Sequence, residues 1–183
     1  MARLPYPKIE ELPEDVRTTL AQLPVQLNVF RMLAHATSCF RPWLRLGTAL
    51  LNELELAPRL RELVILTVAR ECGCAYEWAQ HEALARIVGV PQEQVRAIER
   101  GELSPAAFSE TELLVLAVTK ALLAAPRIDD ELWHRLVANF SPRQIVELCL
   151  VVGFYAMLAR VLETTGVDLD TPFAEALEKT NPS

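Results

Sequence analysis

Three segments of this chain follow the period of an α-helix but are apolar around almost their whole circumference, at residues 60–68, 113–125 and 145–162. Few polar side chains interrupt them, chiefly Arg61, Glu62, Thr119, Lys120, Glu147 and Arg160. A helix that is apolar on every side has to be buried on every side. A chain of 183 residues has room for about one such helix, so we expect some of these faces to close against further copies of the chain.

Helix-capping signals mark two of the helix starts. Ser109 stands three residues before Glu112, and Ser141 stands three residues before Gln144, each ahead of an apolar run. In such a capping box the hydroxyl and the later side chain each accept a hydrogen bond from the other residue's backbone N–H. Pro142 falls at the first helical position, where a missing N–H costs nothing.

Prolines divide the rest of the chain into segments of helical length. We expect breaks at the prolines at positions 24, 42, 58, 91, 105, 126, 142 and 172. The alternation of apolar and polar residues that is typical of strands is absent. The prediction is therefore an all-α fold of about eight to ten helices. We expect a single helical domain over residues 14–179, after an extended arm at 1–13 and before a frayed tail at 180–183.

Charge and composition exclude several classes of protein. The formal net charge is −6, and no basic patch offsets it, so neither nucleic acid nor an anionic membrane is an expected partner. The N-terminal segment has no apolar core typical of a secretory signal. The longest uncharged apolar run, 148–159, is shorter than the ~20 residues that span a bilayer. We therefore expect a cytoplasmic protein whose 4 cysteines are reduced.

The residues that carry chemistry gather around one predicted helix break. Gly73 separates two helices, and the second begins near Cys74 and runs to about residue 88. Glu77 and His81 are four residues apart and so share one face, with Cys74 three residues before Glu77. Glu62, on the preceding helix, approaches the same place if the two helices pack antiparallel.

Each of these groups has a chemical reason to matter there. A helix N-terminus favours negative charge, so the pKa of the Cys74 thiol is expected to be depressed. Glu77 beside His81 is expected to set the tautomer of the imidazole and raise its basicity. Trp78 and Tyr76 are the expected substrate-binding residues, with Trp78 as a flat wall for an unsaturated ring.

Simpler interpretations stay open beside these. A Glu–His pair on a helix is often only a surface charge pair, and Cys72 and Cys74 can be small core residues. A metal site made of Glu62, Glu77 and His81 is conceivable, but no metal-binding motif supports it, and we expect neither metal nor cofactor. An anionic substrate would require a cation, for which the candidates are Arg61, Arg70 and Arg160.

The stretch from Arg61 to His81 resembles the carboxymuconolactone decarboxylase family, which also contains the alkylhydroperoxidase D proteins. Its centre is the run Tyr-Glu-Trp-Ala-Gln-His at 76–81, and the likeness extends from about residue 27 to residue 166. The resemblance implies an all-helical fold that assembles into homotrimers or homohexamers and acts on a small-molecule substrate.

Within that family the peroxidase branch carries a glutamate, eleven intervening residues, then C-x-x-C-x-x-x-H, with two cysteines that cycle between thiol and disulfide. Glu62, Cys74 and His81 match three of these positions, but Glu77 stands where the second cysteine is expected. The decarboxylase branch has E-[FW]-x-x-H, which Glu77, Trp78 and His81 match.

The resemblance therefore implies acid–base chemistry, decarboxylation or a related lyase reaction, on a small unsaturated carboxylate or lactone. The catalytic residues would be His81 and Glu77, supported by Glu62. The first alternative is a thiol antioxidant of the alkylhydroperoxidase or peroxiredoxin type that acts through Cys74. The second is a non-catalytic helical oligomer that binds a ligand.

Overall fold

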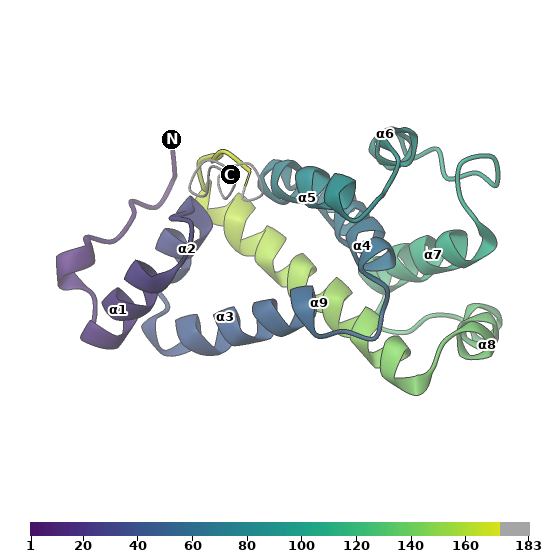
Figure 1. Cartoon of the computed structure of the whole chain (residues 1–183), viewed down its shortest axis with the longest axis horizontal. Coiled ribbons are helices and arrows are strands. Elements are labelled where there is room, and N and C mark those ends of the chain that lie inside the picture. The colour runs from purple at the N-terminus through teal and green to yellow at the C-terminus, as the bar shows by residue number, and fades with distance from the viewer. Residues whose placement is uncertain (173–183) are drawn as a thin grey trace.

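A computed structural model describes residues 1–172 of the chain, and within them every regular element is a helix. This confirms the predicted all-α fold (Figure 1). A short 3-10 turn, η1, precedes nine α-helices. Their bounds are η1 Ile9–Glu11, α1 Glu14–Gln22, α2 Asn28–Leu33, α3 Thr37–Asn52, α4 Pro58–Glu71, α5 Ala75–Ile87, α6 Gln92–Arg100, α7 Glu110–Ala124, α8 Asp130–Asn139 and α9 Pro142–Thr165. The expected tail at 180–183 and the last residues of the expected domain lie outside the described residues.

Helix α4 forms the centre of the fold. Nine consecutive residues of α4, 61–69, are buried. The helix packs against α5, α6, α7 and α9, while α9 runs diagonally through the molecule between α3 and the α4–α5 pair (Figure 1). The all-round burial that the apolar sequence of α4 requires is thus achieved within one chain.

Helix α9 is only partly covered by its own chain. Val146, Leu150 and Met157 are each about half exposed, although most of the helix is buried. Among the described residues, α9 alone is long and apolar enough to cross a membrane, but 61% of its apolar window is buried within the fold. A buried core helix of a folded domain meets the same test of length and composition.

The predicted caps are present, with one correction. Ser109 and Ser141 both form complete capping boxes, and Pro142 occupies the first turn of α9. Pro42, in contrast, does not break the chain but lies inside α3. Pro42 lies in the second turn of α3, near its N-terminus, and its missing N–H removes one backbone hydrogen bond of the helix.

The ends of the described chain are tied to each other. Asp168 accepts hydrogen bonds from Tyr6 and from the backbone of Ala2, at 3.2 and 3.1 Å. Asp170 accepts the backbone N–H of Asn28 at 2.7 Å and the hydroxyl of Tyr76 at 2.5 Å. The segment after α9 therefore anchors both the N-terminal arm and the start of α5.

Gly73 forms the predicted break between α4 and α5. Its φ of +65° lies in the left-handed region, where a residue with a Cβ is strained. An added Cβ would meet nothing within 4 Å, so only the backbone conformation demands glycine. The break turns α5 back against α4, which brings residue 62 close to residue 81.

We expect Gly73→Ala to lower the free energy of unfolding by about 1 kcal/mol, because alanine is strained at positive φ. Gly73→Asn is the matched control, since asparagine tolerates this conformation better and should cost less. Urea denaturation followed by circular dichroism measures both. An equal loss in the two variants would contradict the backbone argument.

Candidate functional site

The centre of the site is a buried carboxylate held between two partners. Glu62, on α4, is fully buried, and its Oε2 lies 2.8 Å from Nδ1 of His81, on α5. Its Oε1 accepts a hydrogen bond from Nε of Arg61 at 2.9 Å. The Arg61 guanidinium also donates to the carbonyl of Leu51, at the end of α3. Glu62 therefore approaches His81 as predicted. Glu77, which was expected to orient the imidazole, forms no hydrogen bond with it.

This arrangement fixes the chemistry of the imidazole. Burial alone raises the pKa of Glu62, but the charges and hydrogen bonds of His81 and Arg61 outweigh it and hold that pKa below its usual value. An ionised Glu62 accepts the Nδ1–H of His81, which leaves Nε2 as the basic nitrogen. Glu62 thus takes the orienting role that the sequence pattern suggested for Glu77.

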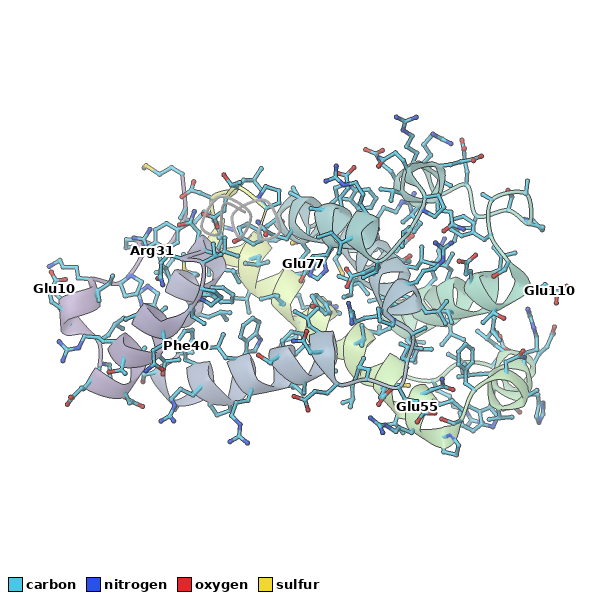
Figure 2. All side chains as sticks on the ribbon, in the orientation of Figure 1. Glu10, Arg31, Phe40, Glu55, Glu77 and Glu110 are labelled. Carbon is cyan, nitrogen blue, oxygen red and sulfur yellow. The ribbon has the colours of Figure 1, made fainter. Side chains whose placement is uncertain are left out.

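Glu77 is a second buried carboxyl group with the opposite character. Its side chain lies in the interior between α5 and α9 (Figure 2), the residue is only 2% exposed, and neither carboxyl oxygen has a hydrogen-bond partner among the described residues. Burial, with a smaller contribution from the charge of Glu163, raises the pKa of Glu77 to about 9. At neutral pH Glu77 is therefore a neutral carboxylic acid, able to donate a proton in a hydrogen bond.

His81 and Glu77 line one cavity of about 360 Å³. Aromatic rings form one of its walls: Trp43 stacks on Phe154 at 5.1 Å between ring centroids, and Phe154 meets Tyr155 edge-on at 5.3 Å. Tyr155 in turn meets the ring of His81 edge-on at 4.9 Å. Gly47 makes room for this wall, since an added Cβ would lie 3.2 Å from the Phe154 ring.

The remaining predicted site residues divide between this cavity and the core. Tyr76 lines the cavity and donates its hydroxyl to Asp170. Trp78 does not line the cavity. It packs instead against the cluster that contains Leu63 and Leu66. The expectation of a flat wall at Trp78 is corrected on this geometry, because one helical step turns residue 78 away from the face that carries residues 77 and 81.

Cys74 lies at the N-cap of α5, but its thiol is not activated. The residue is 1% exposed, and burial together with the charges of Glu77 and Glu163 raises the pKa of the Cys74 thiol to about 12. The expected depression of this pKa is therefore wrong. Burial beside two carboxyl groups outweighs the favourable field of the helix N-terminus. Burial also raises the pKa of Cys72.

Of the three candidate cations, Arg61 alone lines the cavity, and it is already paired with Glu62. Arg70 pairs with Glu71, and Arg160 donates to the carbonyl of Ala156 on its own helix. No group of three metal-ligating side chains lies together within residues 1–172.

The aromatic wall went unpredicted by the sequence pattern. Trp43 lies on α3 and Tyr155 on α9, so both reach the cavity only through the packing of distant helices. The one signal was the pair Phe154 and Tyr155 in an otherwise aliphatic helix.

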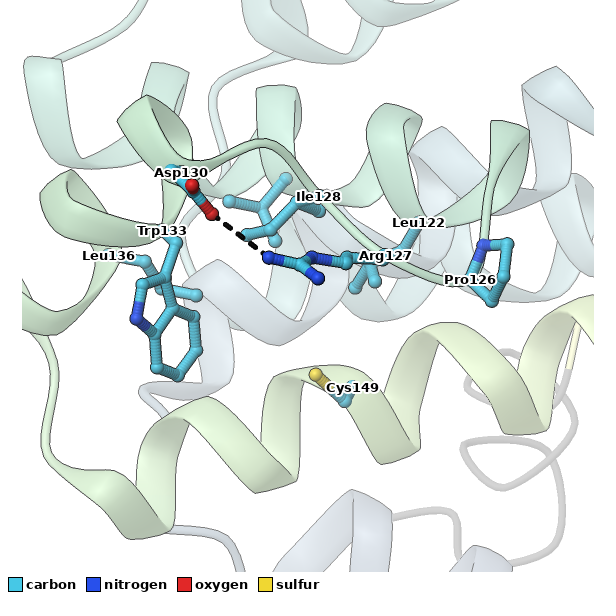
Figure 3. A pocket seen from close by; sticks show the side chains of 9 residues that line it. Leu122, Pro126, Arg127, Ile128, Asp130, Trp133, Leu136 and Cys149 are labelled. Carbon is cyan, nitrogen blue, oxygen red and sulfur yellow. Dashed lines mark hydrogen bonds and ion pairs between the residues drawn. The ribbon is translucent and has the colours of Figure 1, made fainter.

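A second cavity, of about 380 Å³, lies among α7, α8 and α9 (Figure 3). Its walls are mostly aliphatic and include Trp133 and the exposed Cys149. Arg127, its cation, is paired with Asp130 at 3.2 Å. It contains no acid–base pair like that of the first cavity.

Comparison with known proteins finds a family match over the segment that contains the site. The sequence model of the carboxymuconolactone decarboxylase family matches residues 39–121, which hold Glu62, Glu77 and His81. This match spans less than half of the chain, and over these residues the chain is similar to that family. The similarity supports a small-molecule enzyme or a peroxidase-related protein and leaves the reaction open.

Individual relatives are distant. An uncharacterized protein of Bacillus subtilis (strain 168), YdfG, is 28% identical over 94 residues, which is 51% of this chain and 64%, just under two thirds, of the relative. The crystal structure of an uncharacterized peroxidase-related protein from Ralstonia eutropha JMP134, described as an alkylhydroperoxidase AhpD core, has a TM-score of 0.79 at 21% identity, covering 97% of this chain and 95% of that one. A cysteine-to-alanine variant of the debrominase Bmp8, in complex with 2,3,4-tribromopyrrole, has a TM-score of 0.72 at 16% identity, covering 96% of both chains. At these identities the likeness shows a shared fold.

The raised pKa of Glu77 makes a prediction about stability. Because this pKa is higher in the folded protein than in the unfolded chain, the folded protein binds the extra proton between about pH 4.5 and 9, and stability falls as pH rises through that range. Glu77→Gln removes this loss. We expect the stability of the variant relative to wild type to improve by about 2 kcal/mol from pH 5 to pH 8.

Glu112→Gln is the matched control. The pKa of Glu112 is lowered in the folded protein, so this carboxyl group is ionised in both the folded and the unfolded chain over most of this range. The difference between Glu112→Gln and wild type should stay constant from pH 5 to pH 8. Denaturant titrations at both pH values measure the effect. A flat profile for Glu77→Gln would show that Glu77 is ionised in the folded protein.

Proposed function

We propose that this protein is a cytoplasmic enzyme that performs acid–base chemistry, decarboxylation or a related lyase reaction, on a small unsaturated carboxylate or lactone. The observation that carries the proposal is the hydrogen bond between Glu62 and His81 at the wall of a cavity large enough for such a substrate. The match of residues 39–121 to the model of the carboxymuconolactone decarboxylase family supports it.

His81 acts as the base or acid at the reacting carbon. In a lyase reaction on a lactone, Nε2 takes a proton from a ring carbon next to the carbonyl, and the electron pair of the broken C–H bond moves onto the carbonyl oxygen. In decarboxylation the C–C bond to the carboxylate breaks, carbon dioxide leaves, the electron pair passes to the ring, and His81 in its protonated form gives its Nε2 proton to that carbon. Ionised Glu62 stabilises the imidazolium that forms in the first case.

Glu77 stabilises the oxygen on which negative charge develops. A neutral carboxylic acid is a strong hydrogen-bond donor, and in a cavity with little water its effect on a developing oxyanion is large. In this role Glu77 needs no hydrogen-bond partner among the protein's own side chains, which fits the two unpaired oxygens of its carboxyl group.

The thiol alternative has weaker support. A peroxidase would use a thiolate at Cys74, but the pKa of this thiol is raised to about 12 and the residue is 1% exposed. The cavity beside His81 is open rather than filled with side chains, which favours an enzyme over a helical oligomer that only retains the fold.

We expect His81→Ala to lower turnover of an unsaturated lactone at least ~100-fold, because general acid–base catalysis contributes about that much. Glu62→Gln should lower it less, since Nε2 is kept while the stabilising charge is lost. Proton–deuterium exchange at the ring carbon, followed by NMR, and carbon dioxide release from carboxylated lactones measure the two reactions. His134→Ala, at an exposed position on α8, is the control and should keep full activity.

Cys74→Ser separates the lead from the thiol alternative. The variant should keep the lyase activity and consume hydrogen peroxide no more slowly than wild type. Rapid peroxide consumption by wild type that disappears in Cys74→Ser would replace the lead by the thiol alternative.

We also propose that the protein assembles with itself into a homotrimer or homohexamer through α9. Val146, Leu150 and Met157 form an exposed apolar stripe at helical spacing together with Gly153. Such a stripe is typical of a helix seam between subunits. It supplies the uncovered apolar face from which the sequence predicted association.

We expect sedimentation velocity of the wild type to give a mass above the monomer, and Leu150→Glu to shift it toward the monomer, because a buried charge opposes the contact. Ile87→Glu introduces the same charge at an exposed position on α5 and should leave the mass unchanged. A monomeric wild type at micromolar concentration would contradict the proposal.

A further inference from the structure

The cavity that holds the proposed active site has no free positive charge. Arg61 is the only Arg or Lys among its described lining residues, and its guanidinium is held by Glu62 and by the carbonyl of Leu51. Glu62 carries the matching negative charge. A carboxylate ligand would have to draw Arg61 away from Glu62 and leave a buried carboxylate unpaired, which is costly.

The cavity is shaped and lined for a flat ring. Its wall is the series of rings from Trp43 through Phe154 and Tyr155 to His81. The other lining residues are mainly aliphatic, such as Leu27, Leu51, Leu84 and Leu158. Aromatic rings in offset or edge-on arrangements bind another ring through dispersion and quadrupole contacts.

Two hydrogen-bond donors of this cavity have no acceptor in the described part of the chain. One is the indole Nε1–H of Trp43, which is buried and unpaired. The other is the carboxyl group of Glu77, buried and unpaired at both oxygens. Unpaired buried polar groups destabilise a protein, so their presence in a cavity points to a ligand that satisfies them.

We infer that the cavity binds a flat, uncharged ring compound with a carbonyl-type oxygen, and that Trp43 and Glu77 donate the hydrogen bonds that hold this oxygen. The inference rests on the proposed function and deepens it, because it selects the uncharged lactone over the carboxylate as the substrate class. Glu77 is the donor only while it keeps its proton.

The groups around Glu77 explain why it keeps that proton. From α9 it is faced by Glu163 and Tyr155, and from the turn before α5 by Cys72 and Cys74. The charge of Glu163 opposes ionisation of Glu77, and the pKa values of Tyr155, Cys72 and Cys74 are all raised, so no cation among these four groups stabilises an ionised Glu77.

The test is a comparison of benzamide with benzoate, which share shape and size but differ in charge. Isothermal titration calorimetry at pH 7 is expected to show benzamide binding at least ~10-fold more tightly than benzoate to the full chain. Raising the pH from 7 to 10 should weaken benzamide binding to wild type as Glu77 ionises. Glu77→Gln, whose amide still donates, should bind benzamide with no such pH dependence.

Trp43→Phe keeps the ring and removes the N–H, and should weaken benzamide binding about 5-fold, the equivalent of one ordinary hydrogen bond. Trp133→Phe is the matched control, because Trp133 lies at the second cavity, and should leave binding unchanged. Circular dichroism melting establishes that each variant is folded.

Tighter binding of benzoate, or an equal pH profile in wild type and Glu77→Gln, would overturn the inference, as would no binding of benzamide at millimolar concentration. The outcome is separable from that of the proposed function. Binding that depends on Glu77 without turnover of any lactone contradicts only the proposed function. Turnover restricted to carboxylated lactones contradicts only the inference.

Discussion

The rest of the structure depends on how the Glu62 carboxylate is kept ionised at the centre of the fold. A buried carboxylate is stable only when it is paired and hydrogen-bonded. Glu62 satisfies this requirement with Arg61 on its own helix and His81 on α5, and Arg61 continues the network to the end of α3. Glu62 thereby links α4 to α5, and its partner Arg61 links α4 to α3. The contact between Glu62 and His81 also orients the imidazole.

Two carboxyl groups on adjacent helices have been given opposite protonation states by their surroundings. Glu62 gains two partners, and its pKa falls, whereas Glu77 gains none, and its pKa rises to about 9. Such separation of pKa values is typical of sites that need one ionised and one protonated acid at the same pH. The cavity therefore combines an imidazole that an ionised carboxylate orients with a neutral carboxylic acid at Glu77.

The sequence predicted the local features of this site and missed those that depend on helix packing. The capping boxes at Ser109 and Ser141 and the turn at Gly73 were predictable because neighbouring residues determine them. The residue that orients His81 was not predictable in the same way. His81 shares a helix face with Glu77, but only the packing of α4 against α5 shows that Glu62 lies closer to the imidazole. Trp43 and Tyr155 reach the cavity from α3 and α9, and no spacing rule connects residues so far apart. The pKa of Cys74 was predicted in the wrong direction, because the helix position was visible in the sequence and the burial was not.

The residue at position 77 leaves Cys74 without the second cysteine with which it could form a disulfide. In the peroxidase branch of the family that the sequence resembles, a second cysteine at this position lets the first one cycle between thiol and disulfide. A glutamic acid there can form no disulfide, and the pKa of the Cys74 thiol is raised mainly by burial, with a smaller contribution from the charge of Glu77. Cys74 is then free to be a buried structural residue, which is how it lies in the fold. Glu77 also places a neutral carboxylic acid in the cavity that His81 lines, and the proposed reaction uses this acid as its hydrogen-bond donor.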